Sequence, residues 1–517
     1  MAGAEDLTQA RKGSTLSAMR LGHICLLVTA LAAATGFAGE AAPDPAAPAY
    51  AEKPAGRPSP VPVKHPRGTC SGAPRPLAPG AVAADWSRFL GPAQDGTSPE
   101  TKLRCGLDPA PEGQAFPLPL WSVAKGESYA APAVRGRRLV LFHRLGANEV
   151  VECLDAESGG LCWSRAYPTT YRDRYRYLSG PRATPAIDGE RVYTCGAQGV
   201  LHCWDLGTGH LYWRRDLARE FELDEGFFGF TPSPVVEGDL LIVNLGARRG
   251  GTAAFDKARG GLLWLSGDAW GRSYATPVVA EMHGRRVLLV FGGGMSDPPV
   301  GGLLGIEPAT GRVRFQFPWR SPRYFSVNAS TPVVSGSRVF VSSSYDVCGA
   351  GVEVRPDLTC APAYTTRAYA SHWATPILRG EHLYGFYNNA LVCMAWTSGE
   401  LVWKQTLKRP GGEEPAPQAG VKRGADQYRE PPGEQGFGFG SLIWADGRFI
   451  CLGETGLLAW LELSPQGCRM VSACRLFAAS QTWTAPVLSR GLLHICQNLP
   501  GPDTPARLLC YDVRGPP

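Results

Sequence analysis

Apolar and polar positions alternate in short runs along this chain, and one eleven-residue pattern of them occurs five times. The clearest copy is CWDLGTGHLYW at 203–213, and the others lie at 153–163, 254–264, 305–315 and 393–403. A small residue comes first, an acid usually third, Gly seventh and an aromatic residue last. The Gly allows a positive φ, and nearby Asp, Ser and Thr side chains can hydrogen-bond the turn backbone. The pattern predicts a strand, a tight turn and a second strand.

A second pattern is a Thr-Pro or Ala-Pro step, two apolar residues, a turn with Gly and an apolar strand. It starts at Ala131, Ala183, Pro232, Ala275, Ser330, Ala374 and Thr484, with a copy lacking Pro at Gly440. Pro suits the start of an edge strand, and most marker prolines are 43 to 55 residues apart. That interval is typical of one four-stranded propeller blade. Eight starts predict an all-β fold, an eight-bladed β-propeller of four-stranded antiparallel blades.

The two ends of the chain indicate how the ring closes. The last copy, CYDVRGPP from Cys510, stops before an aromatic outer strand, while PLWSV around Trp121 precedes the first blade. We expect the strand at Trp121 to complete the eighth blade, which removes an exposed sheet edge. The segment WSRFLGP at Trp86 is then expected to pack outside the ring or to cap one face.

The amino terminus predicts export. Met19-Arg20 precedes the apolar stretch 24–38, which has the composition of a signal peptide and is short for a membrane span. We therefore expect a signal peptide at 1–38, with 1–18 an unusual leader or an upstream start. A disordered Ala/Pro-rich linker is expected at 39–84, and the propeller at 85–517. The mature protein is expected in the periplasm or cell envelope, or outside the cell.

Charge and cysteine content narrow the function classes. The 52 basic and 46 acidic residues nearly balance, so nucleic-acid binding is not favoured. Cys153, Cys203, Cys393 and Cys510 hold the first position of the repeat, where other copies have Ala or Gly, which predicts tight packing sites. An oxidising compartment makes other cysteines disulfide candidates, and these are the pairs Cys348/Cys360, Cys468/Cys474 and Cys70/Cys105.

The repeats resemble the tryptophan-docking repeat of the pyrroloquinoline-quinone-like propellers, from about Trp86 to the carboxyl end. That superfamily includes quinoprotein alcohol dehydrogenases, whose ring holds the quinone and Ca²⁺. It also includes the cofactor-free propeller of the outer-membrane barrel assembly machinery. The opening WSRFLGPAQDGTS is similar to exported bacterial members. The resemblance implies that the eleventh-position aromatics dock on neighbouring blades as a structural girdle, namely Trp163, Trp213, Trp264, Phe315 and Trp403.

Three departures separate the chain from the dehydrogenases of that superfamily. It has no two adjacent cysteines, no segment that matches their catalytic Asp or Ca²⁺-binding Glu and Asn, and no CxxCH haem attachment sequence. We therefore assign no catalytic residue and expect no cofactor or metal. Pyrroloquinoline quinone and calcium belong only to the alternative interpretation, a dehydrogenase of alcohols or sugars.

A binding site is expected where the loops that enter the innermost strands converge on the channel mouth. The candidate ligand-binding residues are Glu127, Tyr129, Arg182, Phe228, Arg272, Tyr274, Asn328, His372, Trp373 and Trp483, with Phe439 beside them. Such a ring could stack a planar or sugar-like ligand while Arg182 and Arg272 pair with carboxylates. Alternatively, the aromatics plug the channel and the arginines satisfy backbone carbonyls. His372 has no neighbouring His or acid in sequence, so it does not predict a metal site.

Two segments of the sequence are insertions between predicted blades. The aromatic and basic segment 171–181, YRDRYRYLSGP, is either a partner-binding loop or a solvated one, and the polar segment 409–433 is expected to be flexible. The leading hypothesis is a monomeric, non-catalytic binding module that takes a peptide, a protein or a carbohydrate at the mouth, without a membrane span. The alternatives are the dehydrogenase and an assembly scaffold similar to the outer-membrane barrel assembly propeller.

Overall fold

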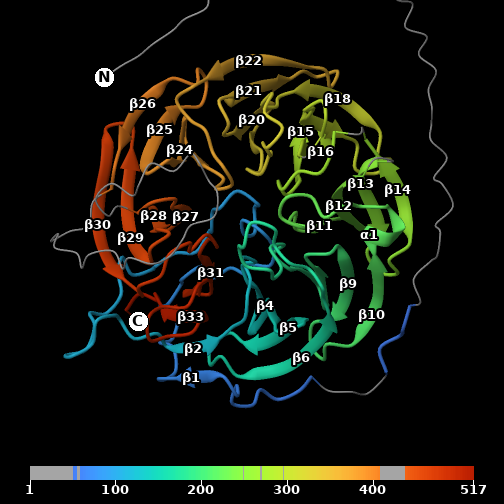
Figure 1. Cartoon of the computed structure of the whole chain (residues 1–517). Helices are drawn as coiled ribbons and strands as arrows, with labels where there is room; N and C mark the ends of the chain where they lie inside the picture. Colours follow the sequence, from blue (N-terminus) through green and yellow to red (C-terminus); the bar gives the residue numbers. More distant parts are fainter. Residues whose placement is uncertain are drawn as a thin grey trace, which may run out of the picture. The chain divides into compact units, whose positions relative to one another are not determined.

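Eight antiparallel sheets form a ring, so the chain is an eight-bladed β-propeller, as the repeats predict (Figure 1). The computed structural model describes residues 50–54, 59–247, 250–267, 270–294, 296–407 and 437–516. The predicted signal peptide with its leader, and the insertion 409–433, lie outside these residues. No helix in the described part of the chain has the length and hydropathy that a membrane span requires.

The blades follow one another along the chain, and each begins with a short innermost strand. Blade one has β3 (Ala133–Arg135), β4 (Arg138–Leu145), β5 (Asn148–Asp155) and β6 (Leu161–Pro168); blade two has β7 (Ala186–Asp188), β8 (Arg191–Cys195), β9 (Val200–Asp205) and β10 (Leu211–Asp216); blade three has β11 (Val235–Glu237), β12 (Leu240–Ala247), β13 (Gly250–Asp256) and β14 (Leu262–Ser266); blade four has β15 (Val278–Met282), β16 (Arg285–Gly292), β17 (Gly302–Ile306) and β18 (Val313–Pro318). The single turn of helix α1 (Leu217–Glu220) follows blade two.

The second half of the ring repeats this order. Blade five has β19 (Val333–Ser335), β20 (Arg338–Ser343), β21 (Cys348–Val354) and β22 (Cys360–Thr366); blade six has β23 (Ile377–Arg379), β24 (His382–Tyr387), β25 (Ala390–Ala395) and β26 (Leu401–Gln405); blade seven has β27 (Ser441–Ala445), β28 (Arg448–Leu452), β29 (Leu457–Ser464) and β30 (Gly467–Arg475); blade eight has β31 (Val487–Ser489), β32 (Leu492–Gln497), β33 (Arg507–Asp512), β2 (Trp121–Ala124) and β1 (Gly68–Cys70).

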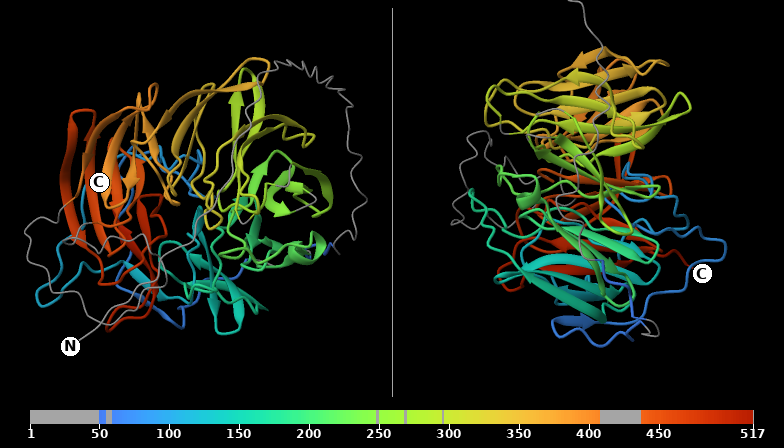
Figure 2. Two further views of the ribbon diagram at one scale, coloured as in Figure 1. Left: turned by 45° about the horizontal axis from the view of Figure 1, so that its top comes forward. Right: turned by 90° about the vertical axis from the view of Figure 1, so that its right-hand side faces the viewer.

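The up-and-down order of the strands gives the ring two different faces (Figure 2). The hairpin turns between first and second strands and between third and fourth strands lie on one face, which we call the turn face. The opposite face, here the loop face, carries the connections from the outermost strand of one blade to the innermost strand of the next. The turn face is therefore built from the repeat, and the loop face from segments that differ between blades.

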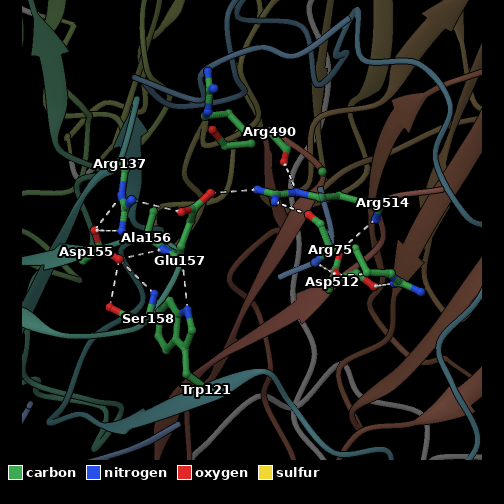
Figure 3. Close-up of polar contacts among 12 residues, drawn as sticks. Arg75, Trp121, Arg137, Asp155, Ala156, Glu157, Ser158, Arg490, Asp512 and Arg514 are labelled. Atoms are coloured by element: carbon green, nitrogen blue, oxygen red, sulfur yellow. Dashed lines mark hydrogen bonds and ion pairs between the residues drawn. The ribbon is translucent and has the colours of Figure 1, made fainter. Parts of the chain in front are cut away.

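Blade eight is closed by a strand from the beginning of the chain, as expected. Strand β2 pairs antiparallel with β33, with Trp121 opposite Cys510. Trp121 is fully buried, and its indole N–H donates to Ala156 O at 3.0 Å in the turn of blade one (Figure 3). Glu157 in the same turn forms an ion pair at 3.1 Å with Arg514, which follows β33 in the chain. The ring is thus joined across its seam by a strand pair, an indole hydrogen bond and an ion pair.

Part of the segment 39–84, predicted to be a disordered linker, pairs with the propeller in the described residues. Strand β1 adds a fifth strand outside β2, with Cys70 opposite Trp121, and Val63 makes a bridge with Leu161 of β6. These backbone pairs form because β2 and β6 are outermost strands, whose free N–H and C=O groups accept another strand. Composition alone missed this, since Ala and Pro content does not show which residues meet a sheet edge.

The segment 84–104 caps the channel at the turn face. Trp86 pairs with Val134 of β3, and Thr97 lies beside Trp444 of β27, so the segment crosses the innermost strands of blades one and seven. Trp86 is 2% exposed. A cavity of about 250 Å³ lies between this cap and the inner strands of blades four and five. The segment therefore lies across part of the channel at the turn face and leaves this cavity beside it.

The outer hairpins pair a small residue with a large ring, except in blade seven, where Ala459 lies opposite Ala473. Cys153 lies opposite Trp163, Cys203 opposite Trp213 and Gly305 opposite Phe315. A Cβ added at Gly305 would lie 2.0 Å from the Phe315 ring. The ring lies across the position of its partner, so only a small side chain fits there. This is the packing role expected for the four repeat cysteines, all of which are 0% exposed.

Candidate binding site at the loop face

The predicted site residues lie on the loops that lead into the innermost strands, and most of them touch one another. Trp483 stacks on Tyr129 with ring centroids 5.4 Å apart and contacts Trp373 at 5.0 Å. His372 contacts Trp373 at 5.6 Å, and Phe439 contacts both of these residues. One aromatic cluster therefore spans the loops before blades one, six, seven and eight.

Arg182 connects this cluster to a second one. Its guanidinium lies 5.2 Å from the Tyr129 ring centroid and 5.8 Å from that of Phe228. Phe228 in turn contacts Tyr274 at 5.4 Å. Arg182 is ion-paired with Asp173 at 2.8 Å, so its charge is already balanced within the chain. Seven of the ten predicted ligand-binding residues are thus joined by ring or cation–π contacts.

Three predicted residues stand apart from those contacts. Glu127 is exposed, and its carboxylate accepts the backbone N–H of Ser179. Asn328 is fully buried and holds the backbone, donating from Nδ2 to Gly292 O at 2.8 Å and to Trp319 O at 3.1 Å. Arg272 is 6% exposed and lies 5.9 Å from the Phe230 ring centroid, away from the aromatic cluster.

The tyrosine hydroxyls of the site are neutral and partly structural. Burial raises the pKa of Tyr129 to about 12, and burial also raises the pKa of Tyr274. The Tyr274 hydroxyl oxygen accepts the backbone N–H groups of Phe227 at 2.7 Å and Phe228 at 3.2 Å. Tyr274 therefore fixes the loop that presents the two phenylalanines.

Four residues of the loop face were missed by the sequence analysis. Tyr177 of the insertion 171–181 contacts both Trp483 at 5.4 Å and Phe228 at 6.1 Å. Tyr324 and Phe325 are 41% and 70% exposed, and both contact Phe227. Arg320 lies in the same loop as these two. A signal was present in SPRYFS, 321–326, which places two aromatics in a loop, but it has no counterpart in other blades.

Little space remains between the rings on the side of blade six. The cavity bounded by His372, Trp373 and Phe439 measures about 10 Å³, which is room for one water molecule at most. These rings therefore fill that part of the mouth, as in the plug interpretation. The exposed aromatics Tyr324 and Phe325 lie outside the plug and face solvent.

The girdle residues reach from each blade to the next on the turn face. The indole N–H of Trp163 donates to Leu206 O at 2.8 Å, that of Trp264 to Pro308 O at 2.9 Å, and that of Trp403 to Ser464 O at 2.8 Å. Trp213 makes the longer equivalent bond to Lys257 O at 3.3 Å, and Phe315 is 6% exposed without an N–H to donate. Trp121 is the girdle residue of blade eight, which the sequence analysis treated only as a strand.

The proposed disulfides do not form in this structure, where all six cysteines are free. Cys468 lies opposite Leu463 and Cys474 opposite Leu458, at the two ends of one hairpin. Because a strand rises about 3.3 Å per residue, the two sulfurs are far beyond bonding reach. The same holds for Cys348 and Cys360, which lie at opposite ends of the β21–β22 hairpin. Cys70 instead donates to Gly72 O, and Cys105 is also free.

The described residues show no group of three or more His, Cys, Asp or Glu side chains placed to hold a metal ion. The described part of the mouth offers rings, arginines and one buried amide instead of a carboxylate cluster. These groups suit stacking and anion recognition, and they do not form the oxygen-rich set that Ca²⁺ prefers. We therefore derive no reaction step through calcium or a quinone.

Two solved structures with TM-scores above 0.5 support the fold, and a third is similar at a lower score. The europium-containing methanol dehydrogenase has a TM-score of 0.54 at 12% identity, over 83% of this chain and 98% of that one. Quinohemoprotein alcohol dehydrogenase from Comamonas testosteroni has a TM-score of 0.52 at 12% identity, over 84% and 81%. BamB from Moraxella catarrhalis has a TM-score of 0.47 at 15% identity, over 75% and 96%. A search of the curated proteins found no significant match.

The repeats also match a family model in sequence. The model described as "Outer membrane protein assembly factor BamB", of the pyrroloquinoline-quinone-like repeat type, covers residues 147–405, which is half of the chain. The matched region contains all five copies of the eleven-residue pattern. The chain therefore belongs to the family of pyrroloquinoline-quinone-like repeat propellers described as outer membrane protein assembly factor BamB.

Proposed function

We propose that this protein is an exported, non-catalytic interaction propeller of the bacterial cell envelope, which binds a segment of a partner protein on its loop face. The observation that carries the proposal is the aromatic surface on that face, which ends in the solvent-exposed rings of Tyr324 and Phe325. The family description as an assembly factor supports an interaction role.

The composition of the loop face favours protein recognition. Tyr, Phe, Trp and Arg side chains are enriched at protein interfaces and supply most binding hot spots. Phe227 is 4% exposed beneath Phe325, so the exposed ring has a rigid support. The arginines Arg172, Arg174 and Arg176 of the insertion are exposed next to the aromatic Tyr175 and Tyr177. A peptide with apolar side chains and some acidic residues is complementary to this surface.

The small remaining space near Trp373 disfavours a buried ligand on that side of the mouth. A planar cofactor would need that space to stack between the rings. A partner segment that lies across the loops does not need it, because it buries exposed side chains instead. For this reason the proposal places the partner across the loop face and not inside the channel.

The test replaces the exposed aromatics and measures partner binding. Tyr324→Ser/Phe325→Ser protein, attached to a resin, should lose a specifically bound envelope protein that the wild-type chain retains. A matched control is Leu401→Ser/Val402→Ser, which removes two exposed apolar side chains of 50% and 39% exposure from the outer strand of blade six. Equal retention by all three proteins would contradict the proposal.

A second measurement separates binding from catalysis. Purified protein is incubated with pyrroloquinoline quinone and Ca²⁺, and alcohol- or sugar-dependent dye reduction is followed. We expect no turnover above the level of the protein-free mixture. Stoichiometric quinone binding with turnover would replace the proposed function by a dehydrogenase.

A further inference from the structure

Arg320 lacks the hydrogen-bond acceptors that two other buried arginines, Arg144 and Arg215, have. Its Nε, Nη1 and Nη2 atoms are all buried and have no hydrogen-bond partner among the described residues. Arg215, by contrast, pairs with Glu220 at 2.7 Å and donates to Gly260 O. Arg144 donates to three backbone carbonyls. Burying a guanidinium without hydrogen-bond acceptors is strongly unfavourable, so Arg320 lowers the stability of the folded protein.

The backbone around Arg320 is fixed on both sides. Trp319 N–H donates to Gly301 O at 3.0 Å, and the Ser321 hydroxyl donates to Tyr345 O at 2.8 Å. These bonds tie the loop after β18 to blades four and five. The position of the Arg320 side chain is therefore set by two neighbouring hydrogen bonds and not by a mobile loop.

Two glycines let the Arg320 side chain lie against the backbone. A Cβ added at Gly293 would be 3.0 Å from Arg320 Cδ, and one added at Gly301 would be 3.1 Å from it. Both glycines belong to the connection between β16 and β17. Any larger residue there would displace the side chain, so this wall of the site is built for the arginine stem.

Two further groups at the same wall are also unsatisfied. Asn328 Nδ2 lies 3.1 Å from the Cβ position of Gly293, and Asn328 Oδ1 is buried without a partner in the described structure. Arg272 packs its backbone against neighbouring Gly294, and its buried Nε likewise lacks a partner. Arg320 and the Asn328 amide therefore share the wall at Gly293, whereas the Arg272 guanidinium lies over the Phe230 ring.

The electrostatics are consistent with an unbalanced positive charge. Burial lowers the pKa of Arg320 to about 10, and only the hydroxyls of Tyr345 and Tyr274 oppose that shift. Burial also lowers the pKa of Arg272, opposed first by the exposed Asp224. Since the described residues contribute no carboxylate to Arg320, an anion from outside the chain would supply the missing charge.

We infer that Arg320, with Asn328 beside it, forms a binding site for an oxyanion, a carboxylate or phosphate group of a ligand. A guanidinium offers two parallel N–H groups to such an anion. Asn328 Oδ1 can accept a hydroxyl from the same ligand. Arg320 as a whole is only partly buried, although its three guanidinium nitrogens are buried. The inference goes beyond the proposed function, because a small anion would bind here with or without a partner protein.

The test measures anion binding to the purified full chain by calorimetry and by thermal unfolding. Inorganic phosphate and glucuronate are the two probes, and sodium chloride at equal ionic strength is the reference. We expect saturable binding of at least one probe, with a Kd of about 1 mM or tighter. A phosphate-only response identifies a phosphate ligand, and a glucuronate-only response identifies a carboxylate ligand.

Two substitutions at Arg320 and one control locate the binding. Arg320→Gln should weaken the Kd by about 10- to 100-fold, because bonds to a charged group are lost. Arg320→Lys keeps the charge but not the parallel donors and should also bind more weakly. The control is Arg286→Gln, which removes an equal charge from an exposed pair with Glu237 at the far end of β16. It should bind as the wild type does.

The melting temperature without anion distinguishes a binding role from a structural one. Removal of an unsatisfied buried charge should leave the Arg320→Gln protein as stable as the wild type or more stable. Binding of neither probe, or equal binding by wild type and Arg320→Gln, would overturn the inference. A large loss of melting temperature in both Arg320 variants would also overturn it, since that result assigns Arg320 to the fold.

Discussion

Aromatic side chains gather in two regions of this propeller and do different work in each. On the turn face, Trp163, Trp264 and Trp403 repeat in register, and each donates its indole N–H to a carbonyl of the next blade. On the loop face, Trp373 and Trp483 each lie three residues before a marker proline, where other blades carry Tyr, Arg, Thr or Ala, and they contact other rings. The difference teaches that repetition marks residues that hold blades together. The proposed partner-binding residues lie on the loop face, where the sequence differs between blades.

The largest expected effect is at the seam of the girdle. Trp121→Ala should lower the free energy of unfolding by about 3–5 kcal/mol, because a fully buried indole and its bond to Ala156 are lost at the ring closure. Denaturant unfolding measures the change. Trp121→Phe is the matched control and should retain most of the packing. A loss below about 1 kcal/mol for the alanine variant would contradict the role of Trp121 in the girdle.

A buried ion pair joins the segment that contains His65 and Arg67 to blade one. Glu152 of β5 binds Arg67 at 2.8 Å and receives bonds from His143 and His65. Glu152→Gln should cost about 3 kcal/mol at pH 7, the lower end for a broken buried pair, since the Arg67 side chain is 33% exposed. Urea unfolding at pH 7 tests this value.

The same carboxylate predicts a pH dependence. Burial raises the pKa of Glu152, but the bonds from His143 and His65 and the charge of Arg67 outweigh it and hold the pKa far below 4.5. An acid with a depressed folded pKa contributes stability above its unfolded pKa and loses it as pH falls below that value. The wild-type protein should therefore lose stability more steeply below pH 4.5 than Glu152→Gln. Parallel curves would contradict this assignment.

A smaller effect tests the pairing of small residues with rings. Gly305→Ala places a Cβ against the Phe315 ring and should cost about 1–3 kcal/mol through overpacking. The double variant Gly305→Ala/Phe315→Leu should recover part of that loss, because the smaller side chain leaves room. No recovery would show that the cost comes from the strand backbone and not from the ring.

The mouth should respond differently from the girdle. Trp483→Ala should cost only about 1–2 kcal/mol, because this residue is partly exposed and lies outside the repeated packing. Partner retention in the resin assay should fall at the same time. If Trp483→Ala destabilised the protein as much as Trp121→Ala, the division between the two regions would fail.

The smallest effect concerns the cysteines. Because all cysteines in the described residues are free, a reducing agent should change the free energy of unfolding by less than about 0.5 kcal/mol. Unfolding curves with and without the agent check this. A marked decrease in the free energy of unfolding on reduction would indicate that one of the disulfides expected from sequence is present.

The sequence predicts the fold well where one residue type must satisfy one local geometry. Gly159 has φ +69, and a Cβ there would meet the Trp121 ring, so the turn glycine is required twice. The copy in blade five was missed because Leu358, and not Gly, takes the positive φ of its longer turn. Its ring is Tyr364, opposite Gly351. A search for Gly in the turn therefore does not find this copy, and only the strand pairing shows it.

The candidate site was predictable in part. Tyr129, His372 and Trp483 directly precede strands whose position the repeat defines, so their convergence follows from the ring. Tyr324, Phe325 and Arg320 lie in the middle of a loop whose path depends on bonds to other blades, such as that of Ser321 to Tyr345. Their positions could not be derived from spacing, because no periodic pattern links them to a strand.

The closure of blade eight sets an order of events for a chain that is synthesised from its amino terminus. Strand β2 at residues 121–124 can pair early only with β1 at 68–70, and its other edge has no partner until β33 at 507–512 has been made. Until then, Trp121 and the edge of β2 are exposed to any passing strand. We expect nascent and carboxyl-terminally shortened chains to be the aggregation-prone species. A chaperone would act on this protein mainly during that interval.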